Sequence, residues 1–204
     1  MIKGGFKMND IINNILTRRS TRTFTEKAIE QDILKDIITA GLYAPSSKNK
    51  QLWHFTVIQN KNILNELSEN TKEAVKKYAS EKISNPDVLK ALNAKAHNDS
   101  YDTFYKAPVA ILISKYTNDD TSQDDCATAS QNIMLAAHSL GIGSCWVGFI
   151  KYLFLLDDNK SKEYLNKFSI PNGYIPTHAI VLGYNKNTGT KASDRRDNTV
   201  SYIY

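Results

Sequence analysis

The chain has 204 residues, of which 41% are hydrophobic and 23% charged, which is ordinary for a globular protein and enough for one domain with a sizeable core. Its net charge of +5 is modest, so we expect no nucleic-acid partner, although a basic nucleic-acid-binding protein remains an open alternative. No apolar run approaches the roughly 20 residues of a membrane span, and the two cysteines lack a C-x-x-C spacing, which favours a cytoplasmic protein with no membrane partner and no metal site.

The first predicted element is an amphipathic helix that ends near residue 17. Its apolar positions repeat with a helical period and predict one buried face, made of Met8, Ile11, Ile12, Ile15 and Leu16. We expect a single domain over residues 1–204, with residues 1–8 as a candidate disordered tail ahead of this helix.

The segment directly after this helix, Arg18-Arg19-Ser20-Thr21-Arg22, carries three guanidinium groups. A guanidinium offers a planar fork of donors to an oxyanion, so the cluster predicts a phosphate site. A second pair, Arg195-Arg196, can clamp the same phosphate if the fold brings the two ends of the chain together. The structural alternative is a solvated basic helix end that complements the helix dipole.

The rest of the chain alternates predicted helices and strands. Helices are expected over residues 30–42, over 61–106 with a break at Pro86, and over 125–140 before Gly141. Strands are expected over residues 53–58 (Trp53, Phe55 and Val57 inward), 109–113, 144–149, 178–183 and, as a terminal strand, 199–204. This order predicts an α+β fold with a mixed sheet flanked by helices.

The loop before the strand at 53–58 is rich in short polar side chains. Its hydroxyl and amide groups can read the edge of a polyol or a heterocycle, although turn chemistry explains them equally well; they belong to Ser46, Ser47, Asn49 and Gln51, after Pro45. No base and acid accompany the serines in a triad pattern, so neither is interpreted as a nucleophile.

A glycine-containing segment, Gly141-Ile142-Gly143 and onward to Gly148, follows the helix at 125–140. Glycines permit close approach of the backbone to a flat ligand, but a helix cap followed by a buried strand explains them equally well. The G-x-G follows a helix rather than a strand, the wrong context for a dinucleotide fingerprint. Cys145 within this segment is interpreted as a buried structural thiol.

Taken together and in this order, six segments resemble the FMN-dependent nitroreductase family over residues 9–204. They are RRSTRTF, APSSKNKQLWHF, FYKAPVAILI, ASQNIMLAAHSLGIGSCWVG, IPNGYIPTHAIVLGY and the late arginine pair. The resemblance implies a three-layer α+β sandwich and a homodimer with an exchanged C-terminal arm. It also implies an oxidoreductase that passes a hydride from NADH or NADPH to FMN and then reduces nitroaromatic, quinone or related small acceptors by a ping-pong mechanism.

The resemblance further implies where FMN binds. Arg18, Arg19, Ser20 and Arg22 would hold the phosphate, ribityl chain and pyrimidine edge, and Arg195 and Arg196 would complete the phosphate clamp. The partner subunit would supply Pro45, Ser46, Ser47, Asn49 and Gln51. Val147 and Gly148 would lie beside flavin N5, and no side-chain acid or base is implied.

Two departures from the family pattern concern the flavin environment. Leu52 stands where many relatives have proline, and the stretch 97–103 lacks a lysine that some relatives add to the flavin contacts. The alternatives are a specialised flavin enzyme of the same fold, dehalogenase-like or flavin-processing, and a non-catalytic protein that stores or senses FMN.

Overall fold

The computed structural model describes residues 9–187, 191–197 and 199–204. Its four strands are β1 (Trp53–Ile58), β2 (Val109–Tyr116), β3 (Gly143–Val147) and β4 (Tyr174–Gly183). Its helices are α1 (Asp10–Thr17), α2 (Gln31–Leu42), α3 (Lys61–Lys82), α4 (Pro86–Ala96), α5 (Ser122–Ser139), α6 (Lys151–Leu155) and α7 (Asn159–Lys167), with a short 3₁₀ turn at Ser47–Asn49.

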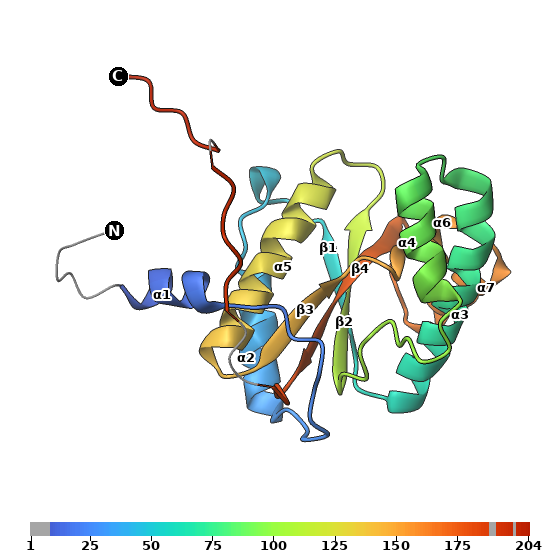
Figure 1. Ribbon diagram of the computed structural model, residues 1–204, viewed down its shortest axis with the longest axis horizontal. Helices are drawn as coiled ribbons and strands as arrows, with labels where there is room; N and C mark the ends of the chain where they lie inside the picture. Colours follow the sequence, from blue (N-terminus) through green and yellow to red (C-terminus); the bar gives the residue numbers. More distant parts are fainter. Residues whose placement is uncertain (1–8, 188–190, 198) are drawn as a thin grey trace.

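The strands form one sheet in the order β1-β2-β4-β3, covered on both faces by helices (Figure 1). α2 and α5 pack on one face, while α3, α4, α6 and α7 pack on the other, so the molecule is a three-layer sandwich. The predicted α+β class is therefore confirmed. The sheet itself differs from the mixed sheet expected, because every pairing between its strands is antiparallel.

The central strand β2 explains why two cores form on the two faces. Its side chains alternate, so Val109 and Ile111 join the core under α2 and α5, whereas Ala110 and Leu112 join the core under α3 and α6. All four are completely buried or nearly so. An apolar run without polar alternation is the pattern of a strand covered on both sides, as the sequence predicts here.

Most predicted elements are present with small shifts at their ends. The break at Pro86 is the start of α4, and α5 ends one residue before Leu140, with Gly141 in a left-handed conformation at φ +74°. The predicted helix over 61–106 stops at Ala96, and turns fill the stretch before β2. Val57 lies on the edge strand β1 and is exposed rather than inward.

The predicted buried face of α1 is wrong for a single chain. Ile11, Ile12, Ile15 and Leu16 are 48–70% exposed, and Met8 lies outside the described residues. α1 touches the body along α5, where the Asn14 side-chain amide donates to the Leu135 carbonyl at 3.0 Å. Periodicity shows that a helix face needs cover, but it does not say which chain provides that cover.

The predicted terminal strand is also absent within the chain. Residues 199–204 form no ladder and extend away from the body (Figure 1). The side chains of Tyr202, Ile203 and Tyr204 are exposed. The candidate disordered tail at 1–8 lies outside the described residues. No helix in the described ranges is long and apolar enough to cross a membrane.

Candidate functional site

The segment after α1 lies against the edge strand β3. Ser20 and Ser144 form an isolated parallel bridge, and the Thr21 N–H donates to the Ser144 carbonyl at 2.8 Å. Gly143 makes this approach possible, because a Cβ at that position would lie 2.7 Å from Thr21 Oγ1. The space that the sequence assigned to a flat ligand at Gly143 is thus filled by the chain itself.

The two guanidinium groups of Arg18 and Arg19 have unused donors in buried positions. Arg19 Nη1 donates to the carbonyls of Leu16 and Arg18 at 2.8 and 2.7 Å. Arg18 Nη1 and Arg19 Nε, in contrast, are buried with no hydrogen-bond partner. A buried donor without an acceptor costs about 1–3 kcal/mol, and more for a charged group, so these atoms mark a place where an anion binds favourably.

The positive charge of these arginines also acts on the C-terminal end of α5. His138 Nε2 lies 3.0 Å from Thr17 Oγ1. Partial burial lowers the pKa of His138, and the neighbouring charges of Arg18 and Arg19 lower it further. The lowered pKa favours the neutral imidazole, so the positive charge at this end of α5 comes from the arginines.

Ser20 and Arg22 approach the thiol of Cys145 on β3. Burial raises the pKa of Cys145, while the charges of Arg22 and Arg18 and a hydrogen bond from Ser20 partly oppose that rise. The thiol is buried and protonated, which agrees with a structural role.

Trp146 of β3 and His178 of the neighbouring strand β4 form an aromatic pair. Trp146 is 38% exposed, and its ring stacks on the buried His178 ring at a centroid distance of 3.7 Å. Both ring nitrogens of His178 are occupied, by Ser130 Oγ at 2.6 Å and Thr177 Oγ1 at 2.8 Å. Burial lowers the pKa of His178 to about 3, so Trp146 rests on a neutral, fixed ring.

β3 ends at Val147, and Gly148 follows it in different surroundings. Val147 is buried in the core under α6. A Cβ at Gly148 would meet only Trp146 Nε1, at 4.0 Å. The backbone at Gly148 therefore faces open space that a flat ligand can approach closely.

The loop between α2 and β1 is held in a strained form at the other end of α5. Lys48, Asn49 and Gln51 all have φ between 52° and 54°. The Gln51 N–H donates to Ser46 Oγ at 3.0 Å, and the Gln51 side-chain amide donates to Asn49 Oδ1 at 2.9 Å. Strain of this kind is often stored at ligand sites.

This loop is fixed to the start of α5. The Ser47 N–H donates to Asp125 Oδ1 at 2.9 Å, and Thr128 Oγ1 donates to the Pro45 carbonyl at 3.0 Å. Asp125 and His138 stand thirteen residues apart on α5, or about 20 Å at 1.5 Å per residue. One chain therefore does not bring the loop at 45–51 together with the arginine segment at 18–22.

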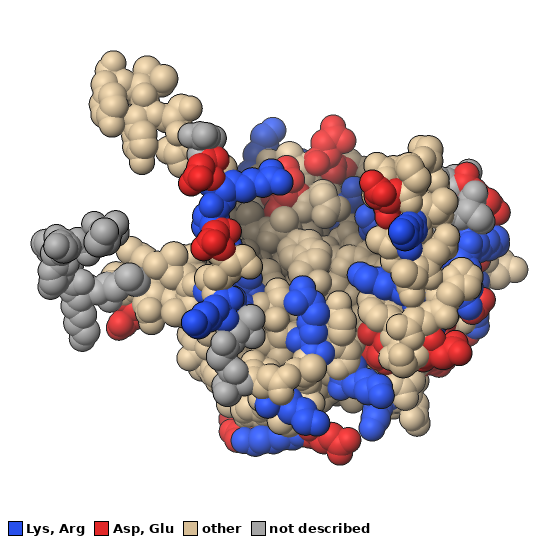
Figure 2. Space-filling view, viewed as in Figure 1, with Lys and Arg blue, Asp and Glu red and all other residues tan. Residues whose placement is uncertain are grey.

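The late arginines are likewise not joined to the first cluster within the chain. Arg195 and Arg196 are exposed, and Arg195 Nη1 donates to the carbonyl of Ser193 at 3.3 Å. The face shown in Figure 2 has a hollow, and both basic and acidic side chains lie around it. Among the described residues, no group of three or more His, Cys, Asp or Glu side chains is placed to hold a metal ion.

Comparison with known proteins identifies the family of this fold. The model of the nitroreductase family matches residues 15–184. The chain belongs to the nitroreductase family. A curated relative from Methanothermobacter thermautotrophicus, provisionally named an NADH dehydrogenase/NAD(P)H nitroreductase, is 32% identical over 200 residues, which cover 93% of this chain and 85% of the relative.

Solved nitroreductases share the fold over nearly the whole length. A nitroreductase from Bacteroides fragilis, with FMN bound, is 31% identical with a TM-score of 0.84, covering 97% of this chain and 100% of that one. An FMN-dependent nitroreductase from Clostridium difficile is 26% identical with a TM-score of 0.79, covering 96% and 99%.

This nitroreductase also has a cavity that sequence reasoning missed. It lies where β1 and β4 end and β2 begins, and three lysines line it: Lys61, Lys106 and Lys186. Lys106 lies in the segment FYKAPVAILI, but Lys61 and Lys186 lie in none of the six segments, and the three lysines are far apart in the sequence, so no local signal groups them. Trp146 and His178 lie in two different segments of the family pattern, and their stacking depends on the pairing of β3 with β4, which no local signal reports.

Proposed function

We propose that the protein is an FMN-dependent NAD(P)H oxidoreductase that reduces nitroaromatic, quinone or related small acceptors by a ping-pong mechanism. One observation carries the proposal: the buried, unpartnered guanidinium donors of Arg18 and Arg19 beside β3. A phosphate monoester supplies the missing acceptors, and a relative 31% identical has been solved with FMN bound.

The residues at this site fit FMN. Arg18, Arg19 and Ser20 would bind its phosphate and ribityl chain, and the open backbone at Gly148, next to Val147, would lie beside the isoalloxazine ring. Bound FMN supplies hydride acceptance from a reduced nicotinamide and electron transfer to the acceptor.

The chain's own residues would tune this chemistry without a proton-transferring side chain. Arg22 would place a positive charge at the pyrimidine edge, where negative charge gathers on reduction, and the partly desolvated setting strengthens that attraction. The pKa values of His138 and His178 are lowered and that of the Cys145 thiol is raised, which favours the neutral form of all three, so the positive charge of the site comes from the arginines.

We propose further that the site is completed by a second copy of the chain. The exposed apolar face of α1 and the groove beside it, lined by Asn14, Leu135 and Ala136 among others, would be covered in a homodimer. The partner would bring Pro45, Ser46, Ser47, Asn49 and Gln51 to the flavin, and the C-terminal arms would cross. Arg195 and Arg196 would then join the phosphate clamp.

The test is optical and uses the purified protein. It should be yellow, and heat-released flavin should migrate as FMN on chromatography. Anaerobic NADH or NADPH should bleach the flavin absorbance, and varying both substrates should give parallel double-reciprocal lines. A protein that binds no FMN after reconstitution would contradict the cofactor, and one whose FMN is never reduced would favour a flavin-storage protein instead.

A further inference from the structure

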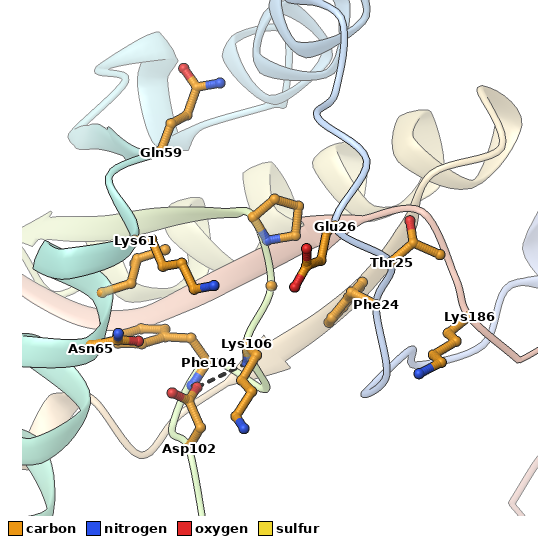
Figure 3. Close-up of a pocket in the computed structure, with 13 residues that line it drawn as sticks. Phe24, Thr25, Glu26, Gln59, Lys61, Asn65, Asp102, Phe104, Lys106 and Lys186 are labelled. Atoms are coloured by element: carbon orange, nitrogen blue, oxygen red, sulfur yellow. Dashed lines mark hydrogen bonds between the residues drawn. The ribbon is translucent and has the colours of Figure 1, made fainter.

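The cavity lined by Lys61, Lys106 and Lys186 does not include the arginines at 18–22, and it opens where β1 and β4 end and β2 begins (Figure 3). Its volume is about 730 Å³, within the range of roughly 300–1,000 Å³ that small-molecule sites occupy. Two of its walls, Phe24 and Pro108, pack against Gly183. A Cβ at Gly183 would lie 2.7–2.8 Å from these side chains, so the missing side chain is what lets them close the cavity.

The lining of the cavity has more positive than negative side chains, with three lysines against the carboxylates of Glu26 and Asp102. Lys61, Lys106 and Lys186 line it, and none of the three forms an ion pair with a described residue. Figure 3 shows Lys61 and Lys186 reaching inward from opposite sides, with the Glu26 carboxylate pointing in between them. Converging ammonium groups repel one another, and a bound anion relieves that repulsion.

The second carboxylate in the lining, Asp102, accepts hydrogen bonds from the backbone of its own loop. Asp102 Oδ1 accepts hydrogen bonds from the N–H groups of Phe104 and Lys106 at 2.8 and 3.0 Å. These bonds hold Tyr105 and Lys106 at φ of 56° and 55°. Strain in two successive residues therefore fixes the position from which Lys106 extends.

The cavity continues toward the proposed flavin site. A neighbouring space of about 350 Å³ shares Phe24, Asp102, Lys106 and Lys186 with it and is also lined by Arg22. Arg22 and Phe24 are two residues apart, which is at most about 7 Å of extended chain. A ligand in the cavity therefore lies close to the residue that we place at the pyrimidine edge.

We propose that this cavity holds the adenosine phosphate half of the nicotinamide dinucleotide that reduces the enzyme; this inference rests on the proposed function. The lysines match the phosphate of this half, and the Glu26 carboxylate can accept hydrogen bonds from ribose hydroxyls. The half-buried Phe24 ring offers an apolar surface to the base, and the side-chain amides of Gln59 and Asn65 can both donate and accept at a base edge.

The experiment compares two donors that differ only in this half of the molecule. NADH carries the adenosine phosphate, whereas reduced nicotinamide mononucleotide lacks it. The test variant is Lys61→Gln/Lys186→Gln. The control, Lys90→Gln/Lys162→Gln, removes the same charge from exposed positions on α4 and α7, outside the cavity. Binding of ADP to the holoprotein by calorimetry gives a readout that needs no turnover.

The expected result is a roughly tenfold fall in kcat/KM for NADH in the test variant and a similar loss of ADP affinity, because charged contacts to the phosphate of the adenosine half are removed. Reduced nicotinamide mononucleotide, the acceptor and the control variant should show unchanged kcat/KM. Equal NADH values in variant and wild type, or an equal fall with the mononucleotide, would overturn the proposal.

The outcomes separate this proposal from the one on which it rests. If the wild-type protein oxidises neither donor, the proposed function fails. ADP binding by the wild type but not by the Lys61→Gln/Lys186→Gln variant would then still support an adenosine phosphate site. Absence of ADP binding to the wild type would reject that site whatever the activity.

Discussion

The two faces of the sheet differ in how many of their charged side chains find hydrogen-bond partners within one chain. Between α3 and α7 three polar side chains are linked: Tyr164 donates to Glu66 at 2.7 Å, and Asn70 donates to Tyr164 at 2.7 Å. Thr103 Oγ1, next to α3, is buried without a partner, but it carries no charge. On the α5 side, Arg18 and Arg19 keep buried donors without acceptors. We call the side of α3 and α7 the finished face, because its charged groups find partners within one chain, whereas the buried guanidinium donors on the other side have the features of a ligand site.

The largest effect should come from placing a charge on the exposed face of α1. We expect Ile15→Asp to convert the dimer to monomers and to release FMN with it, since a carboxylate cannot be buried unpaired in an apolar interface. Leu155 on α6 is the matched control, because it is as exposed as Ile15, at 48% each, but lies on the finished side. Light scattering with a flavin absorbance trace measures both properties.

The proposed difference between the two faces would be wrong if the two variants had the same oligomeric state. An Ile15→Asp protein that stays dimeric, or a Leu155→Asp protein that dissociates equally, would remove α1 from the interface.

The next effect concerns the unpartnered guanidinium groups. Arg18→Ala should weaken FMN binding roughly ten- to a hundredfold, or about 1.5–3 kcal/mol, because a charged partner of the phosphate is lost. Cys145→Ala, which changes a neighbouring buried thiol, should leave the affinity within about threefold, because a thiol contributes no charged contact. Titration of the FMN-free protein by flavin fluorescence quenching decides, and equal affinity for Arg18→Ala and wild type would reject the phosphate assignment.

Gly143, the first residue of β3, and Gly148, the residue after it, should differ in what an alanine substitution changes: stability at the first and FMN affinity at the second. Gly143→Ala pushes a Cβ against Thr21 and should lower the free energy of unfolding by about 1–3 kcal/mol. Gly148→Ala meets open space, so the FMN-free protein should keep its stability while FMN affinity falls. Thermal unfolding with and without FMN measures both; a Gly148→Ala variant that binds FMN normally would place the flavin elsewhere.

The smallest effect should arise on the finished face. Tyr164→Phe should cost about 0.5–1.5 kcal/mol of stability, the usual worth of a hydrogen bond, and should leave FMN binding unchanged. The hydroxyl of Tyr164 and then the charge of Lys167 hold the pKa of Glu66 below its ordinary value of 4.5. Because the folded pKa is depressed, this contribution is present above pH 4.5 and is lost as the pH falls below it.

The variant should therefore lose less stability than wild type between pH 5 and pH 3. Urea unfolding across that range provides the check, and parallel pH profiles for the two proteins would show that Tyr164 does not act on Glu66.

Local patterns predicted most of the fold because each element carries its own signal. The run at 109–113 has no polar residue and forms the central strand. Pro86 marks the start of α4 because its φ is fixed, and Gly141 marks the end of α5 because glycine can adopt a positive φ. The exposed face of α1 and the terminal segment at 199–204 were misassigned for one reason. The periodic spacing of apolar residues predicts that one side of each segment is buried, but within the described chain nothing packs against those sides.

The candidate site divides in the same way. The arginines at 18–22 are contiguous, so the sequence could group them, and the structure adds that their donors are buried and unpaired. The cavity of Lys61, Lys106 and Lys186 depends on loops that meet only in the folded chain. The assignment of Arg195, Arg196 and the loop at 45–51 to the same cofactor stays a prediction, because it requires two chains.

Mixing two deficient chains tests the two-chain site most directly. One chain carries Arg18→Ala, and the other carries Asn49→Ala/Gln51→Ala, two exposed side chains of the loop at 45–51. In their heterodimer, a shared site predicts one cofactor site with both defects and one with none. Titration should therefore find one FMN bound per heterodimer with wild-type affinity, while neither parent homodimer binds FMN that tightly. A heterodimer without any wild-type site would contradict the shared site and place all the FMN contacts within a single chain.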